Sequence, residues 1–141
     1  MTHSIRPAVL ADIPALTRIR LAVVENALSD PARITHAMYV DHVEGRGRSW
    51  VAEADGAIVG FSSADGSDGS IWALFVEPGR EGHGHGKALL RQAVGWLFAL
   101  GHAHVRLTTG AGTRADRFYA AQGWRRDAVE GKDAAFTLAR P

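Results

Sequence analysis

The chain has 141 residues, of which 46% are hydrophobic and 22% charged, a composition typical of one globular domain with a single core over residues 1–141. Its net charge of +1 excludes a strong general attraction to nucleic acid or anionic membranes. Its lack of cysteine excludes a disulfide framework, a thiol nucleophile and zinc sites built on cysteine. Neither a signal-like apolar segment at the N-terminus nor an apolar run approaching about 18 residues occurs, so we expect a cytoplasmic protein.

The N-terminal part of the chain predicts a strand followed by two helices. Residues 4–9 form the expected strand, and Asp12 then begins a helix by capping it. One face of that helix is apolar and carries Ile13, Leu16, Ile19 and Val23. The second helix is expected over residues 34–43 and ends at residues 44–47, which contain two glycines.

Three strands are expected next. Residues 49–54 and 58–64 are joined across Asp55-Gly56, a dipeptide that strongly favours a hairpin turn. Residues 71–76 are continuously apolar, which predicts a central strand buried on both faces.

The C-terminal part predicts two more helices and three more strands. A long helix is expected over about residues 84–100, and a shorter one begins at Thr113 and stops at Gly123. The strands are expected at residues 104–109, 124–127 and 134–139. The predicted order is β-α-α-β-β-β-α-β-α-β-β, which indicates a mixed α/β fold.

The turn before the long helix carries three alternating glycines, Gly82, Gly84 and Gly86. Glycine lets the backbone approach a ligand closely, and the unpaired N–H groups of a helix start attract an anion. Glu81 is the one acidic residue in this turn, and the other polar side chains are His83, His85, Lys87 and Arg91. Because a helix start normally favours acidic residues, this inverted charge predicts that a bound phosphate supplies the negative charge.

Two common phosphate-binding loops do not fit this turn. A P-loop requires a glycine at position 81 and a hydroxyl at position 88, where the chain has Glu81 and Ala88. A G-x-G-x-x-G dinucleotide loop can begin at Gly82 and Gly84, but it fails at Lys87. A glycine-rich loop that binds no ligand is the structural alternative.

Two segments resemble motifs of the GNAT superfamily of acyl-CoA-dependent N-acyltransferases. Residues 81–86, Glu-Gly-His-Gly-His-Gly, are similar to motif A, in which [QR]-x-x-G-x-[GA] opens a helix, except that Glu81 replaces Gln or Arg. Residues 118–124, Phe-Tyr-Ala-Ala-Gln-Gly-Trp, are similar to motif B, F-Y-x-x-x-G-[FW]. The resemblance implies the GNAT fold: a mixed sheet of about six or seven strands, about four flanking helices, and a gap between the fourth and fifth strands.

The resemblance also implies acetyl-CoA as co-substrate. Backbone amides of the turn would hold its pyrophosphate at Gly82, His83, Gly84, His85, Gly86 and Lys87. The pantetheine arm would lie along Leu74, Phe75 and Val76, and the Leu74 N–H would stabilise the thioester oxyanion. Tyr119 would contact the cofactor and protonate the leaving thiolate, although packing of its ring against the sheet is the alternative role.

The general base is left open by the sequence. Ser70 stands where the histone-acetylating branch of the family has a glutamate, and Gly112 stands where many members have an asparagine that contacts pantetheine. The candidate bases are Glu25, Glu53 and Glu77, and a water relay is equally compatible with the pattern.

The acceptor site is expected beside residues 25–31, where the resemblance places one wall of the acceptor pocket. Glu25, Asn26 and Glu53 are candidate substrate-binding residues, since carboxylates suit a cationic amine, but a solvated loop is the alternative. The pairs His83/His85 and His102/His104 do not indicate a metal site, because alternate residues of an extended segment point apart.

The sequence therefore predicts an N-acetyltransferase that moves an acetyl group from acetyl-CoA to a primary amine of a small molecule, by direct attack in a ternary complex. The alternatives are a protein or peptide N-acetyltransferase and a non-catalytic acyl-CoA-binding module. We expect neither nucleic acid nor a membrane as partner. The oligomeric state is open, and a homodimer is possible.

Overall fold

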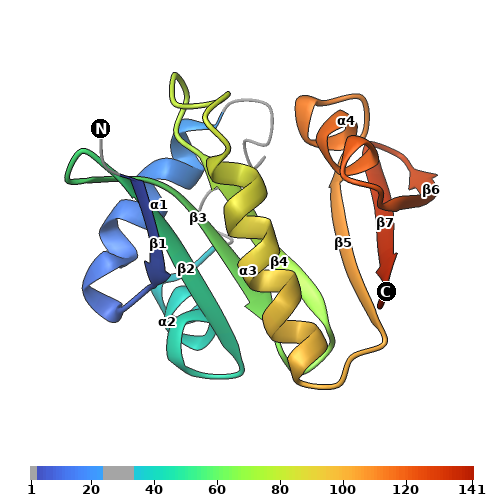
Figure 1. The fold of residues 1–141 in the computed structure, drawn as a ribbon, viewed down its shortest axis with the longest axis horizontal. Coiled ribbons are helices and arrows are strands. Elements are labelled where there is room, and N and C mark those ends of the chain that lie inside the picture. Colours follow the sequence, from blue (N-terminus) through green and yellow to red (C-terminus); the bar gives the residue numbers. More distant parts are fainter. Residues whose placement is uncertain (1–2, 24–33) are drawn as a thin grey trace.

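The computed structural model describes residues 3–23 and 34–141. In these ranges the chain forms a seven-stranded mixed sheet and four α-helices, and their order confirms the predicted arrangement (Figure 1). The strands are β1 His3–Pro7, β2 Gly47–Ala54, β3 Ala57–Asp65, β4 Ser70–Val76, β5 His104–Gly110, β6 Arg125–Glu130 and β7 Asp133–Ala139. The helices are α1 Ile13–Ala22, α2 His36–Glu44, α3 His85–Ala99 and α4 Arg114–Ala121, with a 3₁₀ helix η1 Leu10–Asp12 before α1.

The sheet has the strand order β1-β2-β3-β4-β5-β7-β6, and every neighbouring pair is antiparallel except β4–β5. β4 and β5 run parallel and share a single register pair, Ser70 with Arg106. Beyond that pair the two strands separate, and β5 leans away from β4 in Figure 1. The predicted gap between the fourth and fifth strands is therefore present.

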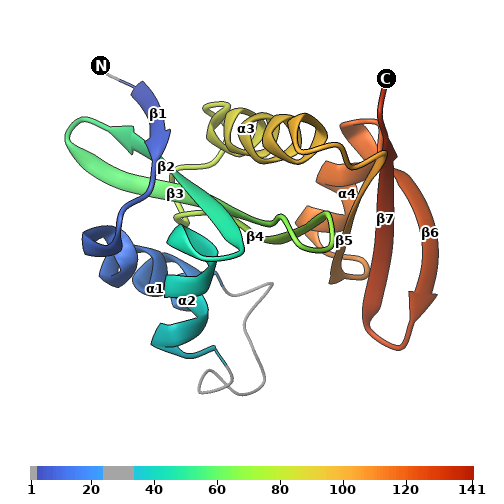
Figure 2. The same cartoon turned by 90° about the horizontal axis from the view of Figure 1, so that it is seen from below.

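Helices cover both faces of the sheet, and each face has its own apolar cluster (Figure 2). On the face covered by α1 and α2, the buried side chains include Ile13, Leu16, Ile19, Tyr39, Val51 and Phe61. On the face covered by α3, they include Trp50, Ala52, Val59, Leu89, Leu90, Ala93, Leu97, Val105 and Phe136. Trp50 and Ala52 belong to one cluster and Val51 to the other, because successive strand residues point to opposite faces.

The start of α1 differs from the prediction. β1 ends at Pro7, and η1 precedes α1. The Asp12 carboxylate does not cap α1; it accepts hydrogen bonds from the Val9 N–H at 2.8 Å and from the Arg6 guanidinium at 2.8 and 3.0 Å. Hydrogen bonding to Arg6 holds the pKa of Asp12 below its usual range. Asp12 therefore ties the first strand to the chain segment that leads into α1.

The prediction that residues 71–76 are buried on both faces is wrong for most of β4. Ile71 and Ala73 are buried, whereas Trp72, Leu74, Phe75 and Val76 are only partly covered. The physical reason is the gap: after Ser70, β4 has no paired strand on its β5 side. The apolar run is a central strand by position, but one of its edges is open.

The ends of α4 agree with the prediction. The Asp116 N–H donates to the Thr113 hydroxyl at 3.2 Å, and the Asp116 carboxylate accepts from the Gly112 N–H at 2.8 Å. Gly123 follows the helix with a φ of +89°, in the left-handed region that glycine tolerates. In the described parts of the chain, none of the helices is long and apolar enough to cross a membrane.

Candidate active site

The turn between β4 and α3 has the backbone geometry of an anion site. Gly82 and Gly84 both have a φ of +83°, which favours glycine at these positions. Gly84 is the N-cap of α3 and provides no side-chain cap, and the first turn of α3 holds no acidic residue. The first N–H groups of the helix have no partner within it and lie at the positive end of its dipole, so this turn attracts negative charge.

A cavity of about 680 Å³ lies beside this turn. Its apolar wall comes from β4 and α4 and consists of Leu74, Phe75, Val76, Ala115, Phe118 and Tyr119. Its polar end contains the glycine turn and the side chains of Arg80, Glu81, Lys87 and Arg114. Three cationic side chains against one carboxylate, next to a long apolar wall, suit a ligand that has phosphate groups at one end and an apolar arm at the other.

Glu81 links the glycine turn to α4. Its carboxylate lies 3.0 Å from the guanidinium of Arg114 and accepts a hydrogen bond from the Gly79 N–H at 2.6 Å. Hydrogen bonds from the backbone N–H groups of Glu81 itself and of Gly79 lower the pKa of this carboxyl, so it is ionised at neutral pH. Glu81 therefore offsets part of the positive charge of the cavity, which Gln or Arg at this position would not do.

Tyr119 lies on α4, and its ring packs against aromatic side chains of the sheet and of the segment after the helix. Its side chain is buried, and its ring centroid lies 5.6 Å from that of Trp124 and 5.7 Å from that of Phe136. Burial raises the pKa of the Tyr119 phenol. The Tyr119 ring packs against the sheet, and the residue also lines the larger cavity, so a packing role is compatible with a contact to the cofactor.

A smaller cavity of about 200 Å³ opens between β4 and β5. It shares four lining residues with the larger cavity, Leu74, Phe75, Ala115 and Tyr119. The other described residues that line it include Arg20, Ile71, Trp72, Ala73, Thr108, Thr109 and Asp133. The two cavities thus meet at Leu74 and Tyr119, at the point where the sheet is open.

Arg20 brings a buried cation to the smaller cavity. Its side chain comes from α1, and its guanidinium carbon lies 4.7 Å from the centre of the Trp72 ring and 5.2 Å from that of Phe75. Burial lowers its pKa from the ordinary arginine value. Arg20 was not among the residues predicted from the sequence, although it lies four residues after Leu16 and so belongs to the apolar face of its helix.

Nine of the ten predicted cofactor residues lie together along the larger cavity: Leu74, Phe75, Val76, Gly82, Gly84, His85, Gly86, Lys87 and Tyr119. The tenth, His83, is exposed and does not line it. The cations Arg80 and Arg114 line the cavity as well, although neither was among the site residues predicted from the sequence. Arg114 is brought to the turn by the packing of α4, which a linear pattern does not reveal.

Of the candidate acceptor and base residues, the structure describes Glu53 and Glu77 and brings neither to the two cavities. Glu53 lies on β2 and accepts a hydrogen bond from Arg6 at 2.8 Å, and Glu77 pairs with Arg18 at 2.5 Å. Neither glutamate lines a cavity. Glu25 and Asn26 lie outside the described residues.

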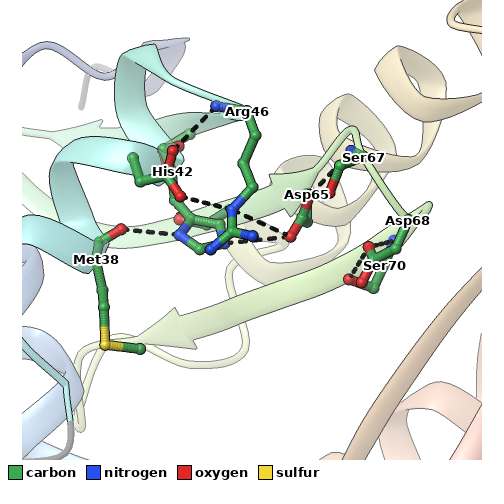
Figure 3. A network of polar contacts seen from close by, with 10 residues as sticks. Met38, His42, Arg46, Asp65, Ser67, Asp68 and Ser70 are labelled. Atoms are coloured by element: carbon green, nitrogen blue, oxygen red, sulfur yellow. Dashed lines mark hydrogen bonds and ion pairs between the residues drawn. The ribbon is translucent and has the colours of Figure 1, made fainter.

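A second polar cluster lies at the opposite end of β4 and has a structural role. Figure 3 shows His42 between the main-chain carbonyl of Met38, 2.8 Å away, and the carboxylate of Asp65, 3.8 Å away. The His42 ring is buried and stacks on Trp72 at 4.0 Å, so this cluster fastens α2 to the sheet. Among the described residues, no group of three or more His, Asp or Glu side chains is arranged to hold a metal ion.

Comparison with known proteins agrees with this geometry. The model of the acetyltransferase (GNAT) family matches residues 14–124. The chain belongs to the GNAT acetyltransferase family. The family match spans both the glycine turn and the α4 motif. In the comparison with curated protein sequences, none matches this GNAT protein at a significant level.

Solved structures share the fold of this GNAT protein over nearly its full length. The PaiA N-acetyltransferase of Thermoplasma acidophilum, in complex with coenzyme A, has a TM-score of 0.85 at 16% identity and covers 99% of this chain and 100% of its own. YncA of Salmonella typhimurium, a putative acetyltransferase with acetyl-CoA, has a TM-score of 0.78 at 21% identity, with 99% and 94% covered. The ribosomal-protein-alanine N-acetyltransferase of Brucella melitensis has a TM-score of 0.78 at 24% identity, with 97% and 99% covered.

Proposed function

We propose that this GNAT protein transfers an acetyl group from acetyl-CoA to a primary amine of a small molecule, by direct attack in a ternary complex. The observation that carries the proposal is the meeting of two cavities at Leu74 and Tyr119. One cavity leads to a cationic helix start, and the other opens between β4 and β5. A donor in the first and an acceptor in the second would meet at their junction.

The larger cavity is assigned to acetyl-CoA. The N–H groups at the start of α3, with Lys87 and Arg80, would hold its phosphates, and the open edge of β4 at Leu74–Val76 would hold its pantetheine arm. Two of the similar structures contain coenzyme A or acetyl-CoA, which supports this assignment by analogy of fold.

The junction residues would carry the chemistry. The amine nitrogen forms a bond to the thioester carbonyl carbon, and the oxygen that becomes negative is stabilised by the Leu74 N–H. The carbon–sulfur bond then breaks, the electron pair leaves with sulfur, and the Tyr119 hydroxyl donates the proton that converts the thiolate to the thiol. The amine loses its proton to water, which returns a proton to Tyr119 through solvent.

Thiol release from acetyl-CoA in the presence of a broad panel of small amines tests this proposal. Turnover that depends on a small amine supports it. Turnover with peptides only would favour a protein or peptide N-acetyltransferase, and tight acetyl-CoA binding without turnover on either panel would favour a binding module.

A further inference from the structure

Arg20 is the most unusual charged residue that the structure describes. Its side chain is only 8% exposed. The Tyr39 side chain forms a hydrogen bond with it, but its Nε and Nη1 atoms are buried with no hydrogen-bond partner among the described residues. Every salt bridge described in the chain involves other residues, so no carboxylate lies within ion-pair distance of Arg20 in the described ranges. A buried guanidinium is normally fully paired, because removing its charge from water is strongly unfavourable.

The aromatic contacts of Arg20 compensate for only part of this burial. Stacking over Trp72 and Phe75 stabilises a cation, but a ring face offers no acceptor for N–H groups that lie elsewhere around the guanidinium. The rings instead fix the plane and position of the guanidinium. This is the arrangement expected of a group that is held ready for an anion.

The position of Arg20 identifies where that anion would come from. Arg20 is the one cationic residue among the described residues that line the smaller cavity, and this cavity meets the donor cavity at Leu74 and Tyr119. An anionic group on Arg20 would therefore belong to the acceptor and not to acetyl-CoA. The planar guanidinium fork matches a carboxylate, which it binds through charge-assisted hydrogen bonds.

We propose that the acceptor is an amino-carboxylate, a small molecule that carries a carboxylate together with its primary amine, and that Arg20 binds the carboxylate. The proposal rests on the proposed function, because it names the class of amine that enters the smaller cavity. Asp133 is the one carboxylate among the described lining residues, and it is exposed, so water screens its repulsion of such a substrate.

The test compares matched pairs of acceptors that differ only in the carboxylate. Amino acids and their α-amides, glycine with glycinamide and glutamate with isoglutamine among them, serve as substrates for acetyl-CoA-dependent thiol release. The amides have the less basic amines and so contain more of the reactive free base, which biases the comparison against the expected result. We expect kcat/KM to be about 30-fold or more higher for the acids in the wild-type protein, as for a buried charge pair.

Two substitutions locate the effect. Arg20→Met keeps the length of the side chain and its packing on the rings, and Arg20→Gln keeps polar atoms; each should remove the preference for the acids while leaving KM for acetyl-CoA unchanged. Arg18→Met is the matched control, because Arg18 lies on the same helix, pairs with Glu77 and lines neither cavity. It makes the same change in net charge and should keep the preference.

Each other outcome overturns the proposal in a distinct way. Equal kcat/KM for acids and amides in the wild type would refute the amino-carboxylate while leaving the small-amine function in place. A preference that survives in Arg20→Met or Arg20→Gln would show that another group binds the carboxylate. Turnover restricted to peptides, or no turnover with any amine, would overturn the proposed function and this inference with it.

Discussion

Substitution of Gly84 provides the sharpest test of the donor site. Gly84 is the N-cap of α3 and has a φ of +83°. Among the described residues, no atom apart from the adjacent backbone lies within 4 Å of the position where a Cβ would stand. Asp and Asn are the two residues that tolerate this left-handed conformation best, and they have nearly the same shape. Gly84→Asp and Gly84→Asn therefore differ essentially by one negative charge.

The expected magnitudes follow from this geometry. Because nothing surrounds the site, the cost to the free protein is conformational, about 1 kcal/mol for either variant, and both should fold. In the complex, one carboxylate at an assumed 5 Å from a phosphate charge costs about 3 kcal/mol at an effective dielectric constant of about 20, or roughly 100-fold in Kd. Gly84→Asp should therefore bind acetyl-CoA about 100-fold more weakly than Gly84→Asn.

Isothermal titration calorimetry with acetyl-CoA measures both Kd values, and thermal melting without ligand checks that the variants are equally folded. The ratio between the two variants should shrink as the salt concentration rises, since it is electrostatic. Equal Kd values for Asp and Asn, or a wild-type Kd in a folded Gly84→Asp protein, would show that no phosphate lies at this helix start.

Three further predictions concern Tyr119, Glu81 and Asp12. Tyr119→Phe keeps the buried ring and should lower kcat by about 10²–10⁴-fold with little change in KM; an unchanged kcat, with chemistry rate-limiting, would leave Tyr119 a packing role only. Glu81→Gln removes the carboxylate that pairs with Arg114 and should lower KM for acetyl-CoA by about two- to fivefold in steady-state kinetics, whereas a higher KM would mean that the ion pair shapes the site. The pKa of Asp12 is lowered in the folded state from 3.8, so its contribution to stability is present above about pH 4 and is lost as the pH falls below that value. In urea unfolding, the free energy of unfolding should therefore fall less steeply with decreasing pH in Asp12→Asn than in the wild type, and the same decrease in both proteins would contradict this.

The sequence was sufficient to predict the order of the elements and most of the residues that line the larger cavity, because these depend on local signals. Gly82 and Gly84 mark a helix start through their own backbone conformations, and Gly123 marks a helix end in the same way. The partial exposure of Leu74 and Phe75 could not be predicted, since it depends on whether β5, about thirty residues away, pairs along the whole of β4.

The surroundings of individual charged side chains were the other feature that the sequence could not predict. Asp12 looked like a helix cap, but the guanidinium of Arg6 and the Val9 N–H occupy its carboxylate. Glu53 looked available as a base, but a strand pairing places it beside the same Arg6. Arg20 lies on the apolar face of its helix, but only the packing of α1 over β4 shows that its guanidinium is buried on Trp72.

The open edge of β4 links the stability of this fold to its function. A strand inside a sheet normally pairs its backbone groups on both sides, and an unpaired polar group away from water costs free energy. After Ser70, β4 has no strand partner toward β5, and the same edge supplies Leu74 and Phe75 to both cavities. A continuous β4–β5 ladder would satisfy these backbone groups, but it would also close the only junction that the described residues form between the two cavities. In the proposed reaction, the open edge of the sheet is the place where donor and acceptor would meet, and ligands that pair with this edge should stabilise the folded protein as they bind.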